Sequence, residues 1–178
     1  ASASSDLDVE KLQSVHDRIM AQIDRGVELI HNMNRFSHTV DEAERDTDLN
    51  ELIAILSVLG KRFADLKNVR FDVELSPASI TVRCSPFRLL EAVFNVELAA
   101  LSVMNADDLL RLSVIQQPGK AGIRASGCDF GELLEAGSLD NSKAILADIK
   151  GDLQLAKDGN SCQNLEIWLP ATVISDVF

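Results

Sequence analysis

The chain has 178 residues, which suffices for one compact domain with a substantial core and an appended element. Its 17 basic and 28 acidic residues give a formal net charge of -11; such a field repels phosphate backbones and anionic lipid surfaces, so we expect neither nucleic acid nor a membrane as a partner. No apolar run approaches the roughly 20 residues that span a bilayer, and the N-terminus lacks the pattern of a signal peptide, so we expect a cytoplasmic protein.

Residues 1–45 are expected to form a helical arm. Between Leu7 and Val40 the sequence has no Pro and a single Gly, and apolar residues recur at spacings of three and four, which predicts a long amphipathic helix. At about 1.5 Å per residue this helix would extend on the order of 50 Å, more than a small domain is wide. Because its apolar stripe must pack on something else, we expect a second helix from another subunit and a homodimer formed through the arm.

Residues 46–178 are expected to form a compact body. Cap, turn and alternation signals predict its elements in chain order: a helix over 49–66 capped by Asp48, strands 69–75 and 80–84, a helix opened by Ser85 and Pro86, a hairpin of 109–117 and 120–126 around Pro118 and Gly119, a helix over 142–150, and a strand pair of 153–159 and 164–170. The acidic stretch 41–48 is expected to be a break, and 127–141 to be less regular. This order predicts an α/β sandwich in which helices cover one face of a single mixed sheet.

The cysteines give no sign of a metal centre or of a disulfide framework. Cys84, Cys128 and Cys162 are odd in number and far apart in the sequence. We therefore expect buried or idle thiols and no metal site.

The sequence from Asp24 to Pro170 resembles the dimerisation and ATPase regions of bacterial sensor histidine kinases. Residues 24–38 are similar to the second helix of the kinase dimerisation hairpin, and 84–101 to the segment that holds the family's Asn box. Residues 123–131 stand where the family has an Asp-x-Gly-x-Gly motif. The resemblance implies a two-layer α/β sandwich of the histidine kinase ATPase (Bergerat) type, attached to a long N-terminal bundle helix.

The residues at the family's nucleotide motifs differ from the pattern. Asn95 aligns with the first Asn of the Asn box, but Ala99 stands where a second Asn helps to hold magnesium, and a methyl group cannot ligate a hard cation. Ala125 replaces the Asp that accepts a hydrogen bond from adenine, Gly127 is retained, and Asp129 replaces the second Gly. We therefore expect no ATP and no other cofactor, and we interpret Asn95 as a residual polar residue that is satisfied within the core.

Two further departures fall on the same site. Cys84 stands where an Asp usually precedes the Asn-box helix, and 138–146 lacks the glycines that cradle phosphates through backbone N–H groups. Together they indicate an ATPase-like fold without nucleotide, that is, a pseudo-kinase body.

A dimeric helical arm joined to such a body resembles the ChpT-type histidine phosphotransferases of phosphorelays. There a His accepts a phosphoryl group from a receiver-domain Asp and passes it to another, while magnesium comes with the receiver. The candidate acceptors are His16, His31 and His38, all on the arm, and at most one of them is expected to act. Helical geometry places His16 within the apolar stripe and the other two on its flank.

A non-catalytic alternative fits the sequence as well. In the family the acceptor His lies on the first hairpin helix, whereas 24–38 matches the second. Under this alternative, we expect the chain to be a dimeric docking module for a response-regulator receiver domain or another regulator, with no phosphoryl chemistry of its own. An ATP-dependent kinase fragment is the least favoured reading, because the nucleotide motifs are incomplete.

Overall fold

The computed structural model describes residues 11, 13–21, 24, 44–157 and 163–171. The chain divides into two units, the arm (Ala1–Thr39) and the body (Val40–Phe178). The predicted boundary at residue 45 stays a prediction.

The described residues of the arm are helical, as the spacing of its apolar residues predicts. Two of these apolar side chains, Val15 and Met20, are 52% and 45% exposed. The rest of the predicted helix lies outside the described residues. Dimerisation through the arm therefore stays a prediction.

The body is built from seven strands and four helices in its described part. In chain order these are β1 (Arg45–Asp48), α2 (Leu49–Leu66), β2 (Arg70–Glu74), β3 (Thr81–Cys84), α3 (Pro86–Val103), β4 (Leu109–Gln117), β5 (Lys120–Ser126), α4 (Phe130–Glu135), α5 (Asp140–Asp148), β6 (Asp152–Lys157) and β7 (Gln163–Pro170). The main sheet has the strand order β2-β4-β5-β7-β6. It is mixed, because β2 and β4 are parallel and every other pair is antiparallel.

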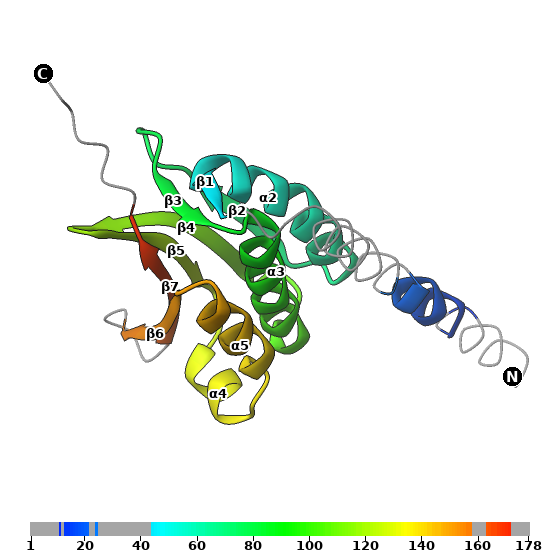
Figure 1. The fold of residues 1–178 in the computed structure, drawn as a ribbon. Helices are drawn as coiled ribbons and strands as arrows, with labels where there is room; N and C mark the ends of the chain where they lie inside the picture. Colours follow the sequence, from blue (N-terminus) through cyan, green and yellow to red (C-terminus); the bar gives the residue numbers. More distant parts are fainter. Residues whose placement is uncertain (1–10, 12, 22–23, 25–43, 158–162, 172–178) are drawn as a thin grey trace, which may run out of the picture. The chain divides into compact units, whose positions relative to one another are not determined.

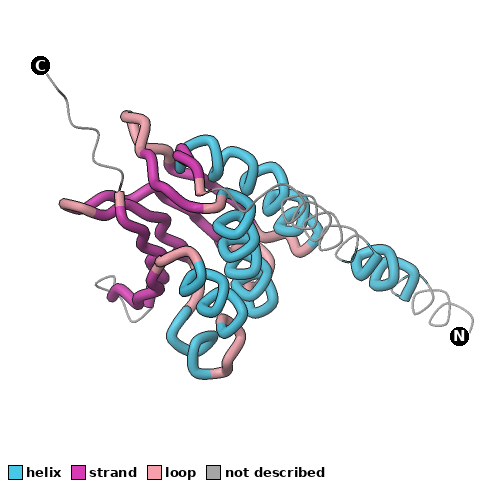
Figure 2. Tube along the Cα trace, in the orientation of Figure 1, coloured by secondary structure: helices cyan, strands magenta, loops and turns pink. Residues whose placement is uncertain are grey.

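The helices lie on one side of this sheet, which makes the body a two-layer α/β sandwich (Figures 1 and 2). Leu110, Leu112, Ile123 and Leu165 are almost completely buried on the strands. Their neighbours along the strands form a polar ladder on the opposite face, in which Arg124 pairs with Glu166 at 2.6 Å. This alternation is typical of a sheet with one covered face, and it confirms the predicted fold class.

Local signals explain where the two long helices begin. The carboxylate of Asp48 accepts hydrogen bonds from the backbone N–H groups of Asn50 (2.7 Å) and Glu51 (3.2 Å), which caps α2 as predicted. Pro86 occupies the first turn of α3, where its missing N–H costs nothing. The β4–β5 hairpin turns at Gly119, whose φ of 78° favours glycine.

The structure corrects the predicted single sheet and the predicted irregular segments. Residues of the acidic stretch form strand β1, which pairs with β3 in a separate two-stranded sheet. The irregular segment contains the short helix α4. Helix α5 ends at Asp148, before the predicted stop at Gly151, and the left-handed residue at its end is Lys150, with a φ of 60°.

None of the described helices combines the length and the apolar composition that crossing a bilayer requires.

Candidate functional site

The positions that align with the nucleotide motifs lie on α3 and at the end of β5, and we call Asn95, Ala99, Ala125 and Gly127 the motif site. On α3, Asn95 and Ala99 lie one helical turn apart, and both are half-buried. No hydrogen bond joins the Asn95 side chain to another described residue. The predicted internal hydrogen bond of Asn95 is therefore not found in this part of the chain.

On the sheet, Ala125 is a core residue. It lies between Leu112 on β4 and Leu165 on β7, and it is only 3% exposed. A methyl group at this point fills space against the helix layer, whereas a carboxylate would have to be paired.

Gly127 is kept for a backbone reason. Its φ is 133°, and a Cβ there would lie 2.2 Å from the carbonyl oxygen of Leu109. Only glycine fits such a position without strain. The glycine is thus explained by the close approach of two chain segments, without any phosphate.

Asp129, which stands where the family has a second glycine, caps α4. Its carboxylate accepts a hydrogen bond from the backbone N–H of Gly131 at 2.9 Å. The next residue, Phe130, is completely buried. Asp129 therefore has a local structural role, because it caps a short helix that places the ring of Phe130 in the core.

Helix α5 is joined to α3 by a buried hydrogen bond and by an ion pair. The Ser142 hydroxyl donates to the main-chain carbonyl of Ala92 at 3.0 Å. Arg88 on α3 contacts Asp148 on α5 at 2.6 Å. Leu139 and Leu146, in the same helix layer, are 0% and 1% exposed. Packed side chains and direct bonds thus connect the elements around the motif site.

The structure also contains a buried carboxyl that the sequence analysis missed. Glu97, between Asn95 and Ala99 on α3, is 0% exposed, and neither of its oxygens has a hydrogen-bond partner. Burial raises the pKa of Glu97 well above its ordinary value. The only sequence signal was a Glu that interrupts an apolar stretch, which is also typical of a surface position.

The thiols give no support to a metal or redox centre. Cys84 is buried, and this burial raises the pKa of its thiol to about 11, so the reactive thiolate is disfavoured. Cys128 is half-buried, and Cys162 lies outside the described residues. Within the described ranges, no group of three His, Cys, Asp or Glu side chains is placed to hold a metal ion.

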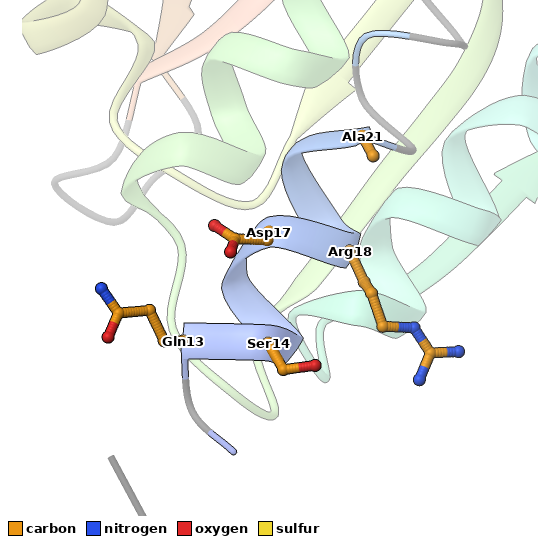
Figure 3. A pocket seen from close by; sticks show the side chains of 5 residues that line it. All are labelled: Gln13, Ser14, Asp17, Arg18 and Ala21. Atoms are coloured by element: carbon orange, nitrogen blue, oxygen red, sulfur yellow. The ribbon is translucent and has the colours of Figure 1, made fainter. Parts of the chain in front are cut away.

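Of the three candidate phosphoryl acceptors, the structure describes His16. Its side chain is exposed on the arm helix, so the predicted stripe is open to solvent at this point. A hollow on the same helix is lined by Gln13, Ser14, Asp17, Arg18 and Ala21 (Figure 3). His31 and His38 lie outside the described residues.

The comparisons with known proteins agree with this architecture. The sequence matches no family model and no curated protein. The structure is similar to the catalytic domain of the histidine kinase ThkA, with a TM-score of 0.59 and 18% identity over 71% of this chain and 95% of that one. It is also similar to the histidine kinase domain of the E. coli osmosensor EnvZ, with a TM-score of 0.56 and 18% identity over 75% of this chain and 92% of that one. For the Acinetobacter baumannii histidine kinase AdeS, the TM-score is 0.58 and the identity 13%, over 96% of this chain and 85% of that one.

At these identities the similarity establishes the fold. The body has the fold of a histidine kinase catalytic (ATPase) domain, as the sequence resemblance predicted. At the motif site, the side chain of Ala99 offers no oxygen ligand for a metal ion, and that of Ala125 offers no hydrogen-bond acceptor.

Proposed function

We propose that the chain acts in two-component signalling as a phosphoryl carrier, moving a phosphoryl group between receiver-domain aspartates through a His and without ATP. One observation carries the proposal: on a histidine kinase fold, three residues at the positions of the nucleotide motifs have structural roles. Ala125 packs in the sheet, Gly127 permits a close backbone approach, and Asp129 caps a helix. We infer that such a fold can contact receiver domains without binding ATP.

The chemistry requires an accessible imidazole. The lone pair of an unprotonated ring nitrogen forms the P–N bond while the P–O bond to the receiver carboxylate breaks, and the carboxylate leaves with that electron pair. Transfer to a second receiver reverses the step. His16 is exposed, as this attack demands, and Asp17 follows it. His31 and His38 stay candidates on sequence grounds.

The test is transfer of label from a phosphorylated receiver domain. The full chain is mixed with radiolabelled phospho-receivers, and label that is acid-labile and base-stable is measured. His16→Gln, His31→Gln and His38→Gln serve as controls for one another, and the proposal predicts that one of them loses the label while two keep it. Receiver binding without any label on the wild-type chain would contradict the carrier role.

A docking module is the second candidate, and an exposed apolar surface on α2 favours it. Ile55 and Val58, three positions apart on this helix, are 50% and 74% exposed, and together they form an apolar surface that a partner could cover. In this case the body binds a receiver or another regulator without phosphoryl transfer.

A matched pair of variants tests the docking role. Val58→Asp is expected to weaken receiver binding at least tenfold, because a charge would be desolvated at the contact. Leu75, which is 49% exposed outside α2, provides the control, and Leu75→Asp is expected to leave binding unchanged. Equal binding by both variants would contradict a contact through α2.

A further inference from the structure

The carboxyl of Glu97 lies in the layer between the helices and the sheet. Its helix α3 packs beside α2 over the sheet (Figure 1). A Cβ built on Gly60 of α2 would lie 2.5 Å from Oε2 of Glu97 and 2.9 Å from the ring of Phe71 on β2. The carboxyl thus contacts the α2 backbone directly, at a point where the absence of a side chain makes room for it.

Nothing in the described part of the chain balances a charge at this point. Both oxygens of Glu97 are buried, and neither has a hydrogen-bond partner. Burial raises the pKa of this group. The charged side chains of the elements packed around it lie at the surface on α2 (Lys61, Arg62 and Asp65) and on β2 (Arg70, Asp72 and Glu74). Arg111 on β4 is half-exposed and pairs with Asp72. Lys67, after α2, donates to the main-chain carbonyl of Leu101 on α3. On α3 itself, Arg88 contacts Glu91 and Asp148 instead.

We propose that Glu97 is a proton-linked latch between α2 and α3. While the helices are packed, the carboxyl is held neutral, because an unpaired carboxylate in apolar surroundings is strongly disfavoured. When they separate, water reaches the carboxyl, which ionises and releases its proton to solvent. Because α3 also carries Asn95 and Ala99, the latch controls how firmly the motif site is held. This role is independent of phosphoryl transfer.

The direction of the pH effect follows from proton binding. The packed state holds the proton up to the raised pKa of Glu97, whereas the open state releases it near the ordinary pKa of a Glu, about 4.3. Between these two values the packed state binds one proton more than the open state. Each unit of rising pH therefore favours opening about tenfold through this group alone.

The test compares the pH dependence of opening in the full chain with that of neutral variants. Opening is measured by hydrogen exchange of the α2 and α3 amides and by urea unfolding. From pH 5 to pH 7, the opening constant of the wild type divided by that of Glu97→Gln is expected to rise about tenfold per unit. Glu91→Gln, on the same helix but beside Arg88, is the matched control and is expected to keep the wild-type dependence. A ratio that does not change with pH would overturn the proposal.

A second measurement covers the case in which Glu97→Gln does not fold. In wild-type protein with ¹³C-labelled glutamate, the Glu97 carboxyl is assigned with the help of Glu97→Leu, and its chemical shift is followed from pH 4 to pH 8. The latch predicts the shift of a neutral acid at pH 7. The shift of a carboxylate at that pH would overturn the latch.

Discussion

The hydroxyl of Ser142 donates a hydrogen bond of 3.0 Å to the main-chain carbonyl of Ala92, and this bond joins α5 to α3 inside the core. Histidine kinases hold their nucleotide in this part of the fold, according to the sequence resemblance. Here the two helices contact one another through a polar bond that apolar side chains surround. The contact gives α5 a structural role in the core.

Removing this hydroxyl should loosen α5. We expect Ser142→Ala to lower the free energy of unfolding by about 1 kcal/mol, the usual net value of a buried hydrogen bond. Ser102 on α3 makes a comparable bond to the Ala99 carbonyl at the surface, so Ser102→Ala is the control and is expected to change little. Urea unfolding of both variants measures the difference. Equal losses of stability in the two variants would show that the hydrogen bond between the helices stabilises the fold no more than the surface bond of Ser102 does.

The cap of α2 should be sensitive to acid. Asp48→Ala is expected to cost about 1 kcal/mol of stability at pH 7, because the first N–H groups of α2 lose their acceptor. The hydrogen bond from Ser79, followed by those from the α2 backbone, lowers the pKa of Asp48 below its ordinary value of 3.8. Its charge therefore stabilises the fold above that value, and this contribution is lost as the pH falls through the lowered pKa.

Urea unfolding at pH 7 and at pH 3 checks this expectation. The difference between wild type and Asp48→Ala should shrink at the lower pH. Asp48→Asn serves as control, since an amide still caps a helix but carries no charge. A difference that grows toward acid would contradict the assignment.

Asn50 should hold the loop before β3 in place. Its side-chain N–H groups donate to the carbonyls of Ser76 (3.0 Å) and Ala78 (3.2 Å), and its oxygen accepts from the Ser76 N–H at 2.9 Å. Asn50→Asp keeps the acceptor and removes both donors, so we expect a loss of about 1 to 2 kcal/mol. The matched control is Asn105→Asp, at an exposed loop position. Hydrogen exchange should show faster opening at 76–80 in Asn50→Asp alone.

Returning the family's carboxylate to the sheet should damage the fold. We expect Ala125→Asp to destabilise the body by on the order of 3 kcal/mol, because the new charge would be buried without a partner. Ala106→Asp, at an exposed loop position, is the control and is expected to be nearly neutral. Thermal unfolding distinguishes the two. A stable Ala125→Asp variant that gained ATP binding would show that the pocket is still present.

The elements that the sequence predicted well depend on local signals. Helix α2 follows its Asp48 cap, α3 begins at Pro86, and the β4–β5 hairpin turns at Pro118 and Gly119. Such residues fix the backbone by their own chemistry. The order of these elements was enough to predict the two-layer fold.

The parts that the sequence missed depend on distant partners. Strand β1 is polar, and it is a strand only because it pairs with β3. The role of Glu97 depends on the lack of a partner on α2 and β2, which no local pattern reveals. The altered motif residues were visible in the sequence, but the roles of Gly127 and Asp129 became clear only from their neighbours in the structure.

Calorimetric titration of the full chain with magnesium and ATP tests most directly the claim that a histidine kinase fold is used here without nucleotide. A catalytic domain of the same fold that binds ATP serves as the positive control. We predict that the chain gives no saturable heat up to millimolar ATP, because Ala99 and Ala125 offer no ligand for magnesium or adenine. Saturable one-to-one binding in the micromolar range would contradict the account.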